Sequence, residues 1–344
     1  MTIEQLPFGN LPDGREVRKF VLKNSRGMEV HIINYGAIIT AILVPDKNHQ
    51  PGDVVLGFDT LDGYLSDHPY FGAMIGRVCN RIGPASFTID GRHYQLTANE
   101  GSNQLHGGTK GFDKVLWTPR TEKTAEEVSL RLTYESPDGE EGYPGNLTAE
   151  VVYELNDDNA LTVSMRAVTD KPTHVNLTNH SYFNLNNCEG EIYDHILMIH
   201  ADRYTVLDEE NIATGEIREV EGTAYDFRFA KPVGQDIHKL GMGYDINFVL
   251  NRTGDEPEKI AAVHDPVSGR TLEVLATQPG VQLYTSNYVN NIQGKGKKVY
   301  HKHSALCLET QHFPNTPNQS SFPSTVLYPG EEYNERIVFR FSAG

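Results

Sequence analysis

The chain has 344 residues, of which 38% are hydrophobic and 22% are charged, a composition typical of a globular protein and not of a disordered or membrane-embedded one. Its 30 basic and 46 acidic residues give a net charge of −16, which disfavours nucleic acid and anionic lipid as partners. The length fits two average domains or one large all-β domain, and no apolar run reaches the ~18 residues of a membrane helix.

Short alternating segments dominate the chain, and turn residues separate most of them. The strongest hairpin signal spans residues 86–96, where β-prone residues flank Asp90-Gly91, a pair that accepts the positive φ angles of a type I′ turn. Helical periodicity is confined to stretches such as residues 60–66. The other predicted strands span, in chain order, residues 17–22, 28–34, 38–44, 128–134, 149–155, 161–168, 173–178, 192–200, 260–264, 271–276, 281–285, 305–310 and 336–341.

This pattern predicts an all-β fold. Many short strands at fairly regular spacing favour a sandwich or barrel over an α/β fold. The alternation is loose, as expected where strands are covered on both faces. Because no linker divides the chain and no clean repeat is evident, we expect residues 1–344 to form a single large β-sandwich domain with few short helices.

The three cysteines, Cys79, Cys188 and Cys307, are odd in number and widely spaced, which predicts reduced thiols rather than disulfides or a zinc site. The amino terminus lacks the basic and apolar regions of a signal peptide, so we expect a cytoplasmic protein. Motifs for phosphate-binding loops, dinucleotide binding, zinc proteolysis and α/β-hydrolase chemistry are missing.

Four segments place polar residues among apolar ones. In residues 72–82, Arg77 could be a buried structural arginine, whereas Asn80 and Arg81 together favour a functional interpretation. In residues 103–108, two glycines after His106 let the backbone approach a ligand or another chain segment closely, although a histidine in a turn remains the alternative.

The third segment is residues 175–184, in which His180 lies at the end of a polar strand face. If this segment is extended, Asn176, Thr178 and His180 share one face. A solvated sheet face is the alternative, but the aromatic pair that follows at residues 182–183 indicates a walled cleft.

The fourth segment is residues 305–314, with Glu309 in the middle of a hydrophobic strand. Burying a carboxylate is costly unless it is paired or functional. This segment alone supports two interpretations equally, pairing with an arginine and a catalytic role. Residues 281–285 behave similarly, with Gln282 and Tyr284 on one face. Histidine pairs at 195/200 and 301/303 could bind a metal, but their spacing and a lysine-rich setting at 295–302 argue against it, so we expect no metal.

Taken together, these segments resemble the galactose mutarotase family of aldose 1-epimerases. The resemblance covers nearly the whole chain in order, and the ordered set is highly specific. The matching stretches are PYFGAMIGRVCNRI (69–82), NQLHGG (103–108), GFDKVLWTPR (111–120), SPDGEEGYPG (136–145), VNLTNHSYFNL (175–185), GYDINF (243–248), TQPGVQLYTSN (277–287), CLETQHFPNTPNQ (307–319) and LYPGEEY (327–333).

The resemblance implies a galactose mutarotase-like supersandwich with an open groove on one sheet. It implies that Glu309 is the general base, that His180 is the general acid and that His106 is a second active-site histidine. Sugar hydroxyls would be held by Arg81 and Asp245, with Asn80 and Gln282 as further polar contacts. Where the family often has Ala before Asn-Arg, this chain has Cys79, a small change.

The expected activity is interconversion of the α and β anomers of a free hexose by acid–base ring opening and reclosure. Histidine suits this role because its ordinary pKa lies near neutrality, and no redox step calls for a cofactor. Three alternatives stay open: a non-catalytic carbohydrate-binding module, a glycoside hydrolase, which needs two catalytic carboxyls, and an epimerase of hexose 6-phosphates. The expected partner is a monosaccharide, and we favour a monomer.

Overall fold

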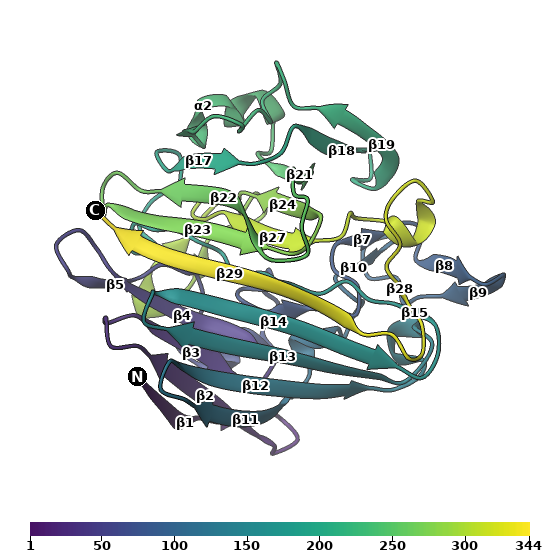
Figure 1. The fold of residues 1–344 in the computed structure, drawn as a ribbon, viewed down its shortest axis with the longest axis horizontal. Helices are drawn as coiled ribbons and strands as arrows, with labels where there is room; N and C mark the ends of the chain where they lie inside the picture. Colours follow the sequence, from purple (N-terminus) through teal and green to yellow (C-terminus); the bar gives the residue numbers. More distant parts are fainter.

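The largest sheet of the computed structural model, which describes residues 1–344, has nine antiparallel strands (Figure 1). The carboxy-terminal strand β29 lies at its centre and joins the two halves of the sheet. In spatial order the strands are β11 (Thr118–Lys123), β12 (Glu127–Ser136), β13 (Leu147–Asn156), β14 (Ala160–Thr169), β29 (Tyr333–Ala343), β23 (Arg270–Ala276), β22 (Glu258–His264), β17 (Ile196–Ile199) and β20 (Lys231–Pro232).

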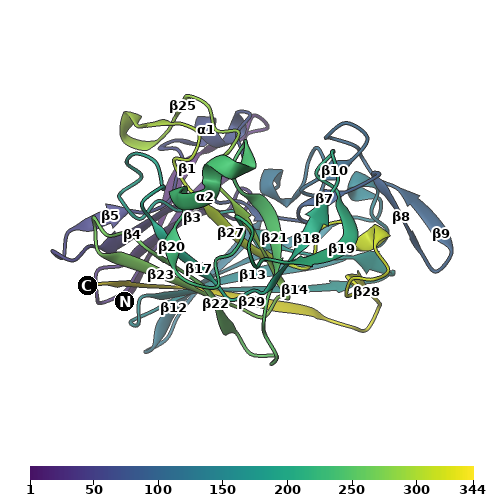
Figure 2. The ribbon, with the colours of Figure 1, turned by 90° about the horizontal axis from the view of Figure 1, so that it is seen from above.

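Two five-stranded antiparallel sheets lie on one side of this large sheet (Figure 2). The amino-terminal sheet contains β1 (Thr2–Asn10), β2 (Glu16–Lys23), β3 (Glu29–Ile33), β4 (Ile38–Pro45) and β5 (Pro51–Asp53). The second sheet, which we call the site sheet, has the spatial order β19 (Ala213–Glu219), β18 (Arg203–Leu207), β21 (Asp245–Val249), β24 (Gly280–Tyr284) and β27 (Cys307–Gln311).

The remaining elements are short. Five two-stranded ladders pair β6 (Met74–Ile75) with β16 (Thr178–Asn179), β7 (Arg81–Ile82) with β10 (Gln104–Leu105), β8 (Ser86–Ile89) with β9 (Arg92–Gln95), β15 (Thr173–His174) with β28 (Val326–Leu327), and β25 (Ile292–Gln293) with β26 (Val299–Tyr300). The helices are α1 (Leu61–Leu65), α2 (Gly234–Ile237) and the 3-10 turns η1 (Phe112–Lys114), η2 (Glu140–Gly142), η3 (His238–Leu240), η4 (Lys295–Lys297) and η5 (Thr316–Asn318). None of these helices has the length and apolar character needed to cross a membrane.

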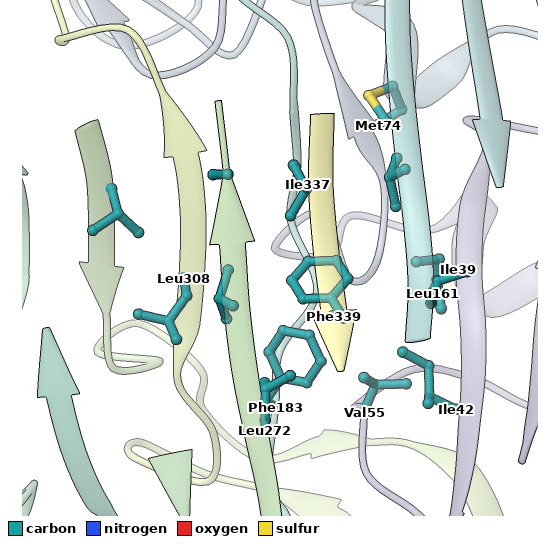
Figure 3. Close-up of a cluster of buried hydrophobic side chains, with 14 of the residues drawn as sticks. Ile39, Ile42, Val55, Met74, Leu161, Phe183, Leu272, Leu308, Ile337 and Phe339 are labelled. Carbon is teal, nitrogen blue, oxygen red and sulfur yellow. The ribbon is translucent and has the colours of Figure 1, made fainter. Parts of the chain in front are cut away.

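A single hydrophobic cluster of 57 buried residues joins the three large sheets. Figure 3 shows part of it, with Leu308 of the site sheet, Ile39 of the amino-terminal sheet, and Phe339 of the large sheet. Since strand side chains alternate between faces, the central strands of the small sheets, such as β2, β3, β21 and β24, send alternate residues into this cluster and leave the others on the outer face. The all-β sandwich with few short helices is therefore confirmed.

Two strand predictions were wrong in extent. Residues 173–178 do not form one strand: β15 ends at His174 and β16 begins at Thr178. Between them the backbone N–H of Asn176 donates to the carbonyl of Arg77, and the Asn176 side chain bonds the backbone of His312. These long-range bonds replace the regular ladder, so the predicted strand face does not exist. Residues 192–195 likewise precede β17 rather than belonging to it.

The predicted hairpin at residues 86–96 forms β8 and β9, and the predicted helix at residues 60–66 forms α1. Several strands had no clear apolar pattern and escaped prediction, among them β1, β11, β18, β19 and β21. The expectation that residues 1–344 form one domain stays a prediction.

Candidate active site

Three strands of the site sheet supply the floor of a pocket. In β27, Leu308 points into the core and Glu309 points to the outer face. In β24, Leu283 enters the core while Gln282 and Tyr284 face outward. Strand register then groups the polar residues, because Gln282 lies directly opposite Glu309 and Asp245 of β21 lies opposite Tyr284.

Two short ladders bring the remaining predicted residues over this floor. Arg81 of β7 pairs with Leu105 of β10, and His106 follows directly. The backbone N–H of His106 donates to the carbonyl of Asn80 at 3.0 Å. His180 follows β16 and is fixed by its own backbone N–H, which donates to the carbonyl of Ala73 at 2.9 Å.

These elements enclose an open pocket of about 380 Å³. All seven residues named from the sequence line it, namely Asn80, Arg81, His106, His180, Asp245, Gln282 and Glu309. Eight others complete the wall, namely Pro69, Tyr70, Glu100, Leu105, Tyr182, Asn211, Tyr284 and Tyr288. Residues separated by more than 200 positions in the chain therefore share one cavity.

At the bottom of the pocket, Glu309 faces His180. The two side chains are 2% and 5% exposed, and 3.5 Å separates Glu309 Oε2 from His180 Nε2. Glu309 forms no ion pair with an arginine, so the arginine-pairing alternative is wrong. Neither Glu309 Oε2 nor His180 Nδ1 has a hydrogen-bond partner. The pair is thus buried but not satisfied, as expected of groups that await a ligand.

Burial changes the acidity of both groups. It raises the pKa of Glu309 well above its usual range, with a further rise from the charge of Asp245 that Arg81 opposes. It lowers the pKa of His180 to about 3. Both shifts favour the uncharged forms, so the ligand-free site prefers a protonated carboxyl beside a neutral imidazole.

A second cluster of polar side chains, formed by Arg81, Glu100, Asp245 and Gln282, lines the wall of the pocket. Arg81 donates to both carboxylate oxygens of Glu100, at 2.7 and 3.0 Å, and its Nη1 lies 4.0 Å from Asp245 Oδ2. Gln282 donates to the other oxygen of Asp245 at 2.6 Å. Glu100 therefore fixes one side of the guanidinium and leaves the opposite side turned toward Asp245 and the cavity.

One ring nitrogen each of His106 and His180 and one carboxylate oxygen of Glu309 lie within 4.8 Å of one another, a donor set of the kind that binds zinc. The hydrogen bonds of His106 oppose this role. The backbone N–H of Asn80 donates to His106 Nδ1 at 3.2 Å, so in the neutral ring the proton is on Nε2. His106 then presents an N–H donor to a ligand, whereas a metal requires a free lone pair.

Arg77, four residues before Arg81, does not reach this pocket. Its guanidinium donates to the hydroxyl of Ser136 at 2.8 Å and to four backbone carbonyls, those of Ser136, Pro137, Pro144 and Gly145. It is therefore the buried structural arginine that the sequence allowed, and it holds the loop at residues 136–145.

The lysine-rich segment also lies elsewhere. Lys295 donates to the carbonyl of Thr40 and pairs with Asp53, and Lys297 lines a separate cavity together with three aspartates. No lysine lines the candidate pocket, where Arg81 is the one permanent cation beside three carboxylates. His303 is also structural, because it bonds Tyr193 Oη and the carbonyl of Met242.

Sequence reasoning missed Tyr70, Glu100, Asn211 and Tyr288. They lie in loops, where no periodicity marks an inward-facing side chain.

A large β-sandwich with a buried histidine–glutamate pair in an open polar pocket defines an enzyme suited to acid–base chemistry. Comparison with known proteins names the family. The aldose 1-epimerase family model matches residues 18–340. The chain therefore belongs to the aldose 1-epimerase family and is an isomerase.

Three relatives illustrate the match. Galactose mutarotase of Sus scrofa is 49% identical over 346 residues, which cover 99% of each chain. Aldose 1-epimerase of Escherichia coli strain K12 is 36% identical and covers 96% of this chain and 97% of its own. The crystal structure of galactose 1-epimerase from Lactobacillus acidophilus superposes with a TM-score of 0.89 at 28% identity, covering 100% of this chain and 99% of the other.

Proposed function

We propose that this chain interconverts the α and β anomers of free hexoses such as galactose and glucose, with Glu309 as general base and His180 as general acid. The observation that carries the proposal is the buried pair itself. A carboxylate and an imidazole face each other at 3.5 Å on the floor of a pocket, and neither is neutralised by another side chain.

The reaction needs two proton movements. Glu309 takes the proton of the C1 hydroxyl while His180 gives a proton to the ring oxygen, and the bond between C1 and the ring oxygen breaks to leave an aldehyde. Rotation about the C1–C2 bond turns the other carbonyl face toward the hydroxyl. Reversal of both proton transfers then closes the ring as the other anomer, and no electron or leaving group has to be stored.

Burial of the pair favours the ring-open stage. Once the ring is open, Glu309 is protonated and His180 is neutral, which are the forms that the desolvated site prefers. The charged forms needed at the start must therefore be supported by the hydroxyl groups of the bound sugar. Opening of the ring therefore removes the cost of the two buried charges, which favours the proton transfers in this direction.

The other polar residues suit a neutral, hydroxyl-rich substrate. Arg81 and Asp245 offer a donor and an acceptor side by side, and Gln282 extends this row. His106 offers the N–H of its Nε2, and Asn80 holds that ring in place through its backbone. We propose that these residues bind the sugar hydroxyls and hold the ring-opened sugar in place while its C1–C2 bond rotates.

The alternatives fit less well. A phosphorylated sugar would meet three carboxylates and a single arginine in the pocket, and no lysine. A non-catalytic module would gain nothing from an unsatisfied buried carboxylate, which costs folding free energy. A hydrolase would need a second carboxyl as acid, but Asp245 is engaged by Gln282 and lies near Arg81.

Polarimetry tests the proposal. Freshly dissolved α-galactose and α-glucose should reach their equilibrium rotation faster with the protein than in buffer, and the final rotation should be unchanged because a catalyst cannot shift it. Heat-inactivated protein is the control. Rates equal to buffer for both sugars would refute the proposal, and a preference for glucose 6-phosphate over both would favour the phosphate-specific alternative.

We also propose that the enzyme acts as a cytoplasmic monomer on a small sugar, without nucleic acid or membrane partners. The reduced state of Cys79, Cys188 and Cys307, all buried and unpaired, agrees with a reducing compartment. Fractionation of cells and size-exclusion chromatography with light scattering test these two points.

A further inference from the structure

His180 lacks the hydrogen bond that usually orients a proton-transferring imidazole. In such sites a second group normally holds the ring nitrogen that does not react. Here Nδ1 is buried without a partner, and the 3.5 Å between Nε2 and Glu309 is longer than an N–H···O hydrogen bond. Something other than a hydrogen bond must therefore fix the plane of this ring.

Two tyrosine rings lie parallel to the imidazole. The ring of Tyr182 is 4.9 Å from that of His180, centroid to centroid, with an angle of 7° between the planes. The ring of Tyr70 is 6.0 Å away with an angle of 14°. His106 and Tyr284 meet the imidazole edge-on, at 5.2 and 6.3 Å.

Tyr182 is itself held firmly. Phe71 meets its ring edge-on at 4.9 Å and Tyr284 does so at 5.9 Å. The side chain is 1% exposed, and the carbonyl of Tyr182 accepts a hydrogen bond from the backbone of Leu56. A ring this constrained can transmit its orientation to the imidazole stacked on it.

We propose that Tyr182, assisted by Tyr70, is the positioning residue of the general acid, and that its ring face orients His180 and stabilises the imidazolium. This inference rests on the proposed function of His180. The physical basis is the negative face of an aromatic ring, which attracts a cation, and the attraction is larger in a desolvated site. The stack thus takes over the two tasks that an orienting carboxylate performs in other enzymes: it fixes the ring, and it opposes in part the burial that favours the neutral form.

Substitutions of Tyr182 separate the ring face from the hydroxyl group. Tyr182→Phe keeps the face and should retain nearly wild-type kcat. Tyr182→Leu keeps an apolar side chain but removes the face, so kcat should fall roughly 10–30-fold, the effect of a cation–π contact in a desolvated site. KM should stay close to that of wild type, because Tyr182 is not among the proposed ligands of the sugar hydroxyls.

Tyr300→Leu is the matched control. Tyr300 is a buried tyrosine of the same 19-residue apolar cluster, but no stacking contact joins it to His180. The Tyr300→Leu substitution should lower the melting temperature and leave the kcat of the folded fraction unchanged. Should Tyr182→Leu fail to fold, Tyr70→Leu at the pocket wall, where the side chain is only partly buried, should show a smaller fall in kcat with the same sign.

Three results would overturn the inference: normal kcat in folded Tyr182→Leu, equal losses in the Leu and Phe variants, or an equal loss in Tyr300→Leu. Failure of the proposed function would look different. In that case the wild type would not speed mutarotation, or His180→Asn would keep its kcat.

Discussion

The two five-stranded sheets pack against the same large sheet, but their outer faces differ in polarity: one carries apolar side chains and the other carries polar ones. In the amino-terminal sheet, the outer residues Ile33 and Ile38 enter a second apolar cluster of 19 buried residues. In the site sheet, the outer residues Gln282 and Glu309 form the floor of a polar pocket. Strands β4 and β27 are buried to a similar degree, yet the first stabilises the fold and the second carries the candidate site.

This difference teaches that burial alone does not identify a functional strand. Ile39 and Glu309 are both almost fully buried, but Ile39 is surrounded by apolar partners, whereas Glu309 is left with an unsatisfied oxygen. A buried polar atom without a partner costs free energy, so one that also lines an open pocket is a candidate for a functional role. Substitutions on the two sheets should therefore affect activity and stability in opposite ways.

The largest effect is expected at the pair on the site sheet. Glu309→Gln and His180→Asn should each lower kcat by ~10²–10⁴, the usual contribution of general acid–base groups, with KM changed much less. The double variant should be far from multiplicative, because both groups act in one event. The melting temperature of Glu309→Gln should stay or rise, since ionising a carboxyl of raised pKa costs the folded protein stability at neutral pH. Near-normal kcat in folded Glu309→Gln would refute the mechanism.

Ile39→Ala on the amino-terminal sheet is the converse experiment. Ile39 is fully buried in the main cluster, so its truncation should lower the free energy of unfolding by about 2–5 kcal/mol. The kcat of the folded enzyme should not change. Denaturant titration and polarimetry on the same sample measure both quantities. A large loss of kcat with an unchanged free energy of unfolding would contradict the view that the amino-terminal sheet serves stability and the site sheet serves activity.

The pH profile should reflect the environment of the pair. In the proposed mechanism the active form carries one proton, on His180, while Glu309 is ionised. Because the pKa of Glu309 is raised and that of His180 is lowered to about 3, the pair holds a single proton at pH values between these two pKa values. The acid limb of the profile should therefore follow His180, and the alkaline limb should follow Glu309. An alkaline limb near the ordinary histidine pKa of about 6.5 would contradict this view.

A smaller effect is expected at Glu100, which clamps Arg81. Glu100→Gln removes the charge of a partly exposed ion pair but keeps a hydrogen-bond acceptor, so KM should rise roughly 3–10-fold with little change in kcat. Glu16→Gln, in an exposed pair with Arg18 on the amino-terminal sheet, is the control and should change neither constant. A loss confined to kcat would mean that Glu100 acts on the chemical step instead.

The smallest effect should follow from chelation. EDTA should leave kcat/KM unchanged, because the fixed proton on His106 Nε2 opposes metal binding by the histidine–glutamate cluster. Loss of activity that zinc or manganese restores would show that the cluster works as a metal site.

Local pattern was sufficient for the fold class, whereas the resemblance of the ordered motifs to a known family supplied most of the site. Alternation marked β4, β24 and β27, and it separated Leu308 from Glu309 because side chains of a strand alternate strictly. The ordered motifs named all seven predicted pocket residues, and all seven line the pocket. Residues 173–178 failed because bonds to distant loops replaced the ladder that local pattern implies.

The sequence by itself determined the strand faces of Gln282 and Glu309, but only the tertiary structure decided what each site residue meets. Periodicity carries no information about partners that lie more than 100 residues away, such as His180 for Glu309. Long-range register and loop packing also place Glu100 on Arg81, fix the tautomer of His106 and stack Tyr182 on His180. The physical reason is that local propensity sets backbone conformation, whereas acidity and orientation depend on the neighbours that folding brings together.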